Sequence, residues 1–253
     1  MRREYPDRHM PYWLELTHKQ FIKACHETEV ALMVVGALEA HGDHLPLGSD
    51  TILPNYLADI VANRTKALVL PPIPFGESWT FEEFEGTVCV TPAALLNYYS
   101  DVMEGVFKHG FRYIVALNGH GGNSSLLQLA ARKSTTGGER AVIVVNWWID
   151  LGKEIRQKLL ESPEGHAAED ETSEMMCVRP DLVDTSSYKS SEVKTKYAVV
   201  SARYRGELFP SAVRGDPTKA TREKGSRFME EAARELLELI AQLEKGELPL
   251  TKG

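Results

Sequence analysis

The feature that most constrains the fold is a series of short apolar runs separated by longer stretches with helical periodicity. The apolar runs span 30–35, 67–70, 111–117 and 141–145. Runs of this kind are typical of strands buried on both faces, as in parallel sheets covered by helices. The chain is therefore predicted to adopt an α/β fold, a three-layer sandwich with a mostly parallel central sheet and helices on both faces. No repeat or linker divides residues 1–253, so one domain is expected.

The predicted helices lie between and around these strands. A capping box at 17–20 begins the first helix, Pro92 takes the first position of another, and Gly246 ends the last. Residues 73–90 form a long aromatic segment of the kind that binds ligands, and residues 185–214 have no clear periodicity. The predicted helices span 17–27, 52–62, 92–108, 124–132 and 151–160, with a short helix ending at Arg179 and a terminal helix from Asp216–Pro217.

A polar cluster follows directly on the first apolar run. Glu39 and His41 are two residues apart, so in extended chain they project to the same side, and Asp50 follows after a turn-rich loop. Carboxylates and an imidazole at the carboxyl end of a buried strand are typical of a first-row metal site. The alternative is a solvated turn. His44 in the same loop is expected to be structural, hydrogen-bonded within that loop.

A second polar cluster, Asn118–Asn123, follows the third apolar run. Because the two strands are predicted neighbours, His120 of this cluster can join the first. One bridging carboxylate with imidazoles and further carboxylates suits two divalent ions, and zinc, manganese or iron(II) would accept such ligands. The alternative is a glycine-rich helix start that binds an anion on free backbone amides. Asn118, Gly121 and Gly122 are candidates for binding substrate.

A third group lies at 166–174, where His166 precedes four acids at 169, 170, 171 and 174. An ordinary surface histidine and a solvated acidic helix face would explain these residues equally well. Met175 and Met176 are expected in the core. Trp147 and Trp148 follow the fourth apolar run, so one is expected to pack and the other to line a pocket.

Charge and cysteine content exclude several classes of protein. A formal net charge of −7 and the absence of a basic run argue against a nucleic-acid or anionic-membrane partner. The three scattered cysteines form no CxxC motif, so reduced, buried thiols are expected, with neither a disulfide framework nor a thiolate metal site. No apolar run approaches membrane-spanning length, and a cytoplasmic protein is expected.

Taken together, the motifs at 36–51, 118–123 and 166–173 resemble those of the creatininase (creatinine amidohydrolase) family. The turn at 85–87 and the segment at 215–225 fit the same family, and the resemblance is collinear from about Trp13 to Leu243. It implies a hydrolase with a dinuclear metal centre that acts on amide-like bonds of a small polar molecule. It also implies a homo-oligomer, a hexamer built from dimers.

Roles for individual residues follow from this resemblance. Glu39, Asp50 and His120 would hold one divalent ion, and His41 and Asp50 would hold the other, so that Asp50 bridges the two ions. His166 matches the residue that donates a proton to the leaving nitrogen. Trp148 aligns with an aromatic residue that covers the substrate.

The chain departs from true creatininases at one position. They have a glutamate two residues after the histidine matched by His120, where this chain has Gly122. We expect Glu171 to replace that ligand, which requires His166 to precede the helix that carries Glu171. The departure argues against creatinine as the substrate; family members also include a formamide hydrolase, a peptidase and a ring hydrolase. Two alternatives stay open: a carbon–carbon or ring-opening hydrolase of a cyclic ketone, and a non-catalytic binding homologue.

Overall fold

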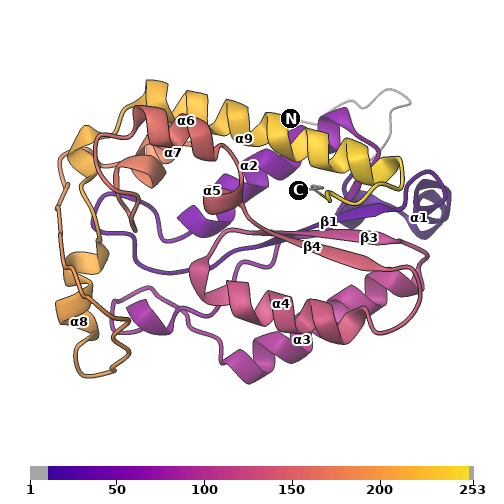
Figure 1. Ribbon diagram of the computed structural model, residues 1–253, viewed down its shortest axis with the longest axis horizontal. Coiled ribbons are helices and arrows are strands. Elements are labelled where there is room, and N and C mark those ends of the chain that lie inside the picture. The colour runs from indigo at the N-terminus through magenta and orange to yellow at the C-terminus, as the bar shows by residue number, and fades with distance from the viewer. Residues whose placement is uncertain (1–10, 251–253) are drawn as a thin grey trace.

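A computed structural model describes residues 11–250 and confirms the predicted α/β architecture (Figure 1). Strands β1 (Val30–Val35), β2 (Leu68–Val69), β3 (Tyr113–Asn118) and β4 (Ala141–Asn146) form one parallel sheet in the order β2-β1-β3-β4. Strands β1 and β3 are in register from Val30 opposite Tyr113 to Val35 opposite Asn118. The two strands therefore end side by side, and the loops that follow them start from the same edge of the sheet.

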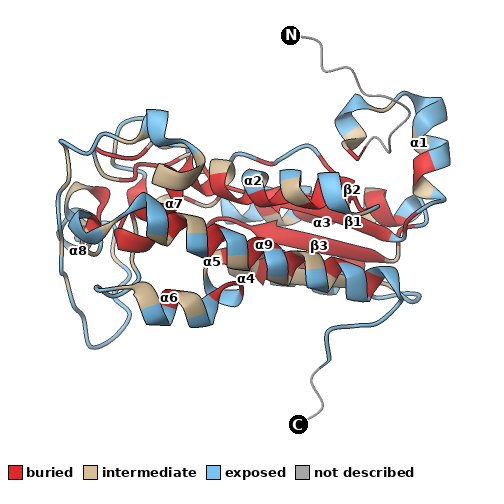
Figure 2. Cartoon of the chain, turned by 90° about the horizontal axis from the view of Figure 1, so that it is seen from above, coloured by how far each residue is buried: buried red, intermediate tan, exposed pale blue. Residues whose placement is uncertain are grey.

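Helices cover both faces of the sheet. On one face lie α2 (Ser49–Arg64), α7 (Glu169–Val178) and α9 (Arg222–Glu244), and on the other lie α3 (Pro92–Lys108) and α4 (Ser124–Ser134) (Figure 1). Side chains of β1 alternate between the two layers, so Leu32 packs in one core and Met33 in the other. All six residues of β1 are buried, as the unbroken apolar run predicts (Figure 2).

The remaining elements are short, and several differ from expectation. They are α1 (His18–Cys25), α5 (Trp147–Asp150), α6 (Lys153–Leu159) and α8 (Arg205–Leu208). The helix expected around 151–160 is present as α6, whereas α5 before it was not expected; Gly152, in a left-handed conformation (φ 65°), separates the two. The terminal helix begins at Arg222 rather than near Asp216, after a short 3-10 turn at Pro217–Lys219. The three cysteines are half-buried rather than buried.

The start of α2 brings Asp50 to the ends of β1 and β3. This helix begins at Ser49, so Asp50 lies in its first turn rather than in the preceding loop. The approach depends on two glycines: a Cβ at Gly119 would lie 1.9 Å from the backbone oxygen of Asp50, and one at Gly36 would lie 2.2 Å from Oγ1 of Thr51. Each strand is followed directly by a glycine, which leaves room for the helix.

Within residues 11–250, no helix is both long and apolar enough to cross a membrane.

Candidate metal centre

Five predicted residues meet at the carboxyl ends of β1 and β3. Nε2 of His41 lies 3.1 Å from Oδ1 of Asp50 and 3.1 Å from Oε1 of Glu171. Nδ1 of His120 lies 3.0 Å from the other oxygen of Asp50, Oδ2, and 3.3 Å from Oε1 of Glu39. The two oxygens of Asp50 therefore face two histidines from different loops, which is the arrangement of a bridging carboxylate.

The backbone fixes which nitrogen of each histidine faces the carboxylates. Nδ1 of His41 lies 3.0 Å from the carbonyl oxygen of Glu39, and Nε2 of His120 lies 2.7 Å from that of Glu77. Because a carbonyl oxygen only accepts, these nitrogens carry protons and donate them. The opposite nitrogen of each ring faces the carboxylates and can bind a metal once it has released its proton, which is how metal-binding histidines are held by their second nitrogen.

Several carboxylate oxygens of this cluster have no hydrogen-bond partner among the described residues. Both oxygens of Glu39 and Oδ2 of Asp50 are buried and accept no hydrogen bond of good geometry from the described residues. No lysine or arginine within residues 11–250 forms an ion pair with Glu39, Asp50 or Glu171. Buried carboxylates are normally paired or bound to metals, so divalent cations fit this donor set. Three groups of side chains could each hold an ion: Glu39–Asp50–His120, His41–Asp50–Glu171 and Glu39–His41–His166.

The pKa values of the cluster reflect the excess of negative charge. Burial lowers the pKa of His41, but the carboxylates of Glu171 and Asp50 outweigh it and raise that pKa well above the usual value. The pKa of His120 is raised in the same way by Glu39 and Asp50, against burial. Burial opposes ionisation of Asp50, yet the two histidines lower its pKa. In the metal-free chain, His41 and His120 therefore carry protons that they must release before they can bind a cation.

His166 lies beside the cluster, held by a turn of unusual backbone. Its ring stacks on Phe81 (centroids 4.0 Å apart) and lies 4.4 Å from that of His41. Nε2 lies 2.9 Å from the carbonyl oxygen of Ala40, so Nδ1 is the free nitrogen, 3.9 Å from Oε1 of Glu39. Burial and the neighbouring His41 lower the pKa of His166. Ala167 then adopts a left-handed conformation (φ 51°) and donates its N–H to Oε2 of Glu171 at 2.8 Å, which places His166 before α7 as expected.

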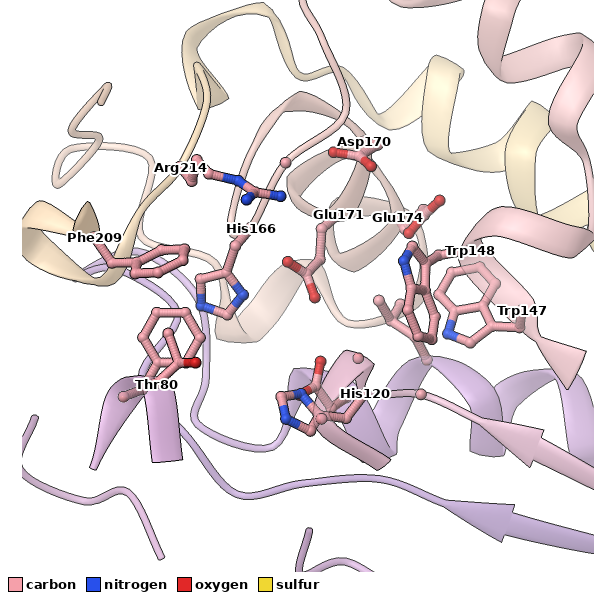
Figure 3. A pocket seen from close by; sticks show the side chains of 17 residues that line it. Thr80, His120, Trp147, Trp148, His166, Asp170, Glu171, Glu174, Phe209 and Arg214 are labelled. Carbon is pink, nitrogen blue, oxygen red and sulfur yellow. The ribbon is translucent and has the colours of Figure 1, made fainter. Parts of the chain in front are cut away.

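A cavity of about 240 Å³ opens above the cluster (Figure 3). Seven predicted site residues are among those that line it: Asp50, His120, Gly121, Gly122, Trp148, His166 and Glu171. Glu39 and His41 lie beneath it, both fully buried. Asn118 is fully buried and does not line it; its side chain accepts the N–H of His120 at 3.1 Å and donates to the carbonyl oxygen of His120 at 2.8 Å.

Other predicted residues take places outside the cluster. Nε2 of His44 lies 3.0 Å from Oγ1 of Thr172 on α7, so His44 is hydrogen-bonded to that helix rather than within its own loop. Trp147 is buried, yet both tryptophans line the cavity. The solvated acidic face is wrong, because Glu169, Asp170 and Glu174 are buried. Phe81 lines the cavity and belongs to the aromatic segment 73–90, for which ligand binding was expected. Sequence reasoning did not single out the cavity residues Phe209 and Arg214, which come from segments without local polar motifs.

The structure also explains why a glycine stands at position 122. A Cβ there would lie 2.0 Å from the backbone oxygen of Glu77, the atom that accepts the proton of His120. The loop that carries Glu77 occupies the space that a side chain at 122 would need. Oε1 of Glu171 instead approaches His41 from α7.

Comparisons with known proteins find relatives over most of the chain. The family model described as creatininase (creatinine amidohydrolase) matches residues 14–240. A creatinine amidohydrolase of Pseudomonas putida is 31% identical over 251 residues, covering 90% of this chain and 95% of the relative. A mycofactocin precursor peptide peptidase of Mycobacterium ulcerans (strain Agy99) is 28% identical over 227 residues, covering 85% and 86%. A solved manganese creatininase superimposes with a TM-score of 0.81 at 27% identity, covering 92% of this chain and 98% of that one.

Proposed function

Because the chain belongs to the creatininase family, we propose that it is a metal-dependent amidohydrolase with a dinuclear centre. Its reaction is the hydrolysis of a carbon–nitrogen amide bond, such as that of a formamide, a lactam or a small peptide-like molecule. The observation that carries this proposal is the position of Asp50, whose two carboxylate oxygens face His41 and His120 separately.

Each ion has a set of ligands in this proposal. Glu39, Asp50 and His120 hold the first, and His41, Asp50 and Glu171 hold the second. Glu171 replaces the glutamate that true creatininases carry at the position of Gly122. Zinc, manganese and iron(II) all accept this mixture of nitrogen and oxygen donors. When bound, the ions polarise a substrate carbonyl and lower the pKa of a water.

The protein side chains supply positioning and proton transfer. His166 is neutral near pH 7 because its pKa is lowered, and its Nδ1 is free because Nε2 donates to Ala40. Nδ1 takes a proton from the attacking water and delivers it to the leaving nitrogen. Phe81 holds the ring of His166 by stacking, and Trp148 covers the substrate and excludes water.

Metal analysis and a substrate screen test this proposal. Purified protein, loaded separately with zinc, manganese and iron(II), is expected to retain about two ions per chain after gel filtration. The loaded protein is then assayed against formamides, lactams, small peptides and a cyclic ketone. Two ions with turnover of an amide support the proposal, and turnover of the ketone alone would reassign the bond that is broken. One ion or none, without turnover, would identify a non-catalytic homologue.

A further inference from the structure

Arg214 occupies a defined place in the cavity, and we propose that it binds an anionic group of the substrate beside His166. The group is a carboxylate or a phosphate monoester on the molecule whose amide bond is cleaved. This inference deepens the proposed function and rests on it. It narrows the substrate class from polar amides to amides that carry a negative charge near the scissile bond.

The backbone directs Arg214 toward the site. The backbone N–H of His166 donates to the carbonyl oxygen of Arg214 at 2.9 Å. The backbone N–H of Arg214 donates in return to the carbonyl oxygen of His166, also at 2.9 Å. Residues directly opposite each other in such an antiparallel pair project their side chains to the same face. Arg214 and His166 both line the cavity, and Figure 3 shows the guanidinium turned toward it, next to His166 (Figure 3).

The guanidinium is held but not neutralised. It lies 5.7 Å from the ring centre of Phe209, which limits its movement. Within residues 11–250, Arg214 forms no ion pair, whereas Arg205 nearby binds both Glu82 and Glu83. Among the described residues that line the cavity, Arg214 alone carries a permanent positive charge. An arginine fixed at a site without an acidic partner is a ready partner for a ligand oxyanion.

The chemistry of the ligand follows from the guanidinium and the ions. A guanidinium donates two parallel hydrogen bonds to the paired oxygens of a carboxylate or phosphate, which a neutral amide cannot accept in the same way. The carboxylates of Glu39, Asp50 and Glu171 would repel such an anion in the metal-free chain. Two divalent ions outweigh these three charges, so the loaded site accepts an anionic substrate.

Calorimetric titration of the metal-loaded protein with matched probes tests the inference. The probes are N-acetylglycine with its neutral partner N-acetylglycinamide, and N-acetyl-O-phosphoethanolamine with its neutral partner N-acetylethanolamine. We expect at least one anionic probe to bind about tenfold more tightly than its neutral partner. In Arg214→Gln this preference falls to within about twofold, while the neutral probes bind as before. Whichever pair shows the preference identifies carboxylate or phosphate as the group that is recognised.

A matched control separates a local contact from general charge. Arg203 also lies over an aromatic ring, that of Tyr204, but is exposed and outside the cavity, so Arg203→Gln should keep the full preference. A preference that survives in Arg214→Gln would mean that the ions alone bind the anion, and equal or undetectable binding of all probes would also overturn the inference. Because the titration needs no turnover, a protein that hydrolyses amides without this preference contradicts only the inference, and the preference without hydrolysis contradicts only the proposed function.

Discussion

Two groups of buried charge meet on helix α7, and they are balanced in different ways. Glu171 belongs to the candidate metal centre, where three carboxylates have no lysine or arginine partner among the described residues. Glu174, one turn later, binds Nη1 of Arg156, whose guanidinium is fully buried and lies 5.1 Å from the ring centre of Trp147. One cluster contains its own cation, and the other needs a cation from outside.

The difference separates a functional cluster from a structural one. Removing one member of a buried carboxyl–guanidinium pair leaves the other unpaired, which destabilises the folded state. A buried carboxylate without a cationic partner is stable only with bound protons or metal ions. We therefore expect variants of the candidate metal centre to change metal content and activity, and variants of the Arg156–Glu174 pair to change folding stability.

The largest effect is expected from Asp50→Ala. Because Asp50 would serve both ions of the proposed centre, its loss should lower kcat/KM by at least about 10³-fold and reduce metal content to less than half. Circular dichroism should show a folded chain. Asp43→Ala is the matched control, since Asp43 lies in the loop before α2 but is exposed and paired with Lys189. Normal turnover by Asp50→Ala would exclude the bridging role.

Arg156→Met should have the next largest effect, on stability alone. It leaves Glu174 buried without its donor, which we expect to cost about 3 kcal/mol in the free energy of unfolding. Urea denaturation of the metal-free protein measures this change, and adding Glu174→Leu should recover part of the loss. Metal content of the folded variant should match that of the wild type. If Arg156→Met loses metal without losing stability, the division between the two clusters is wrong.

His166→Ala tests a residue at the border of the metal centre. As a proton carrier, His166 should contribute about 10²-fold to kcat without holding an ion. Metal analysis should therefore still find both ions, as it should in the exposed control His26→Ala. The geometry allows another outcome, because Glu39, His41 and His166 could together hold an ion. Loss of an ion from His166→Ala would make His166 a ligand.

The sequence predicts the residues of the candidate metal centre well. Glu39, His41, Asp50 and His120 lie within short motifs directly after two apolar strands, and parallel strands bring their ends together at one edge. The same apolar runs predict the sheet and both layers of helices. The apolar pattern does not mark α5, because this helix is a single turn that Gly152 separates from α6.

The pair of Arg156 and Glu174 is not predictable from local sequence patterns. Arg156 and Glu174 are 18 positions apart, and nothing near either residue marks them as partners. The same holds for Arg214, whose pairing with His166 joins segments that are distant in sequence. A motif reports residues that the chain itself brings close, whereas these contacts depend on how α6, α7 and the segment before α9 pack.

The smallest effect is expected in the pH dependence of stability. Burial raises the pKa of Glu174 from 4.5 to about 8, against the opposing effect of Arg156. Between these values Glu174 keeps a proton in the folded chain and releases it in the unfolded chain. The contribution of Glu174 to the free energy of unfolding is therefore complete below about pH 4.5 and is lost as pH rises toward 8. Glu174→Gln cannot release this proton. Its free energy of unfolding should therefore decline less than that of the wild type over this range.

Denaturant titrations of the metal-free proteins at several pH values measure that difference. The histidines and Asp50 of the metal centre also titrate, but they are common to both proteins, so they cancel in the comparison. Glu230→Gln, an exposed position on α9, should follow the wild-type curve. Parallel curves for Glu174→Gln and the wild type would show that Arg156 keeps Glu174 ionised throughout. Arg156 and Glu174 would then form an ion pair at every pH tested. In that case Arg156→Met should lower the free energy of unfolding by more than the roughly 3 kcal/mol expected above.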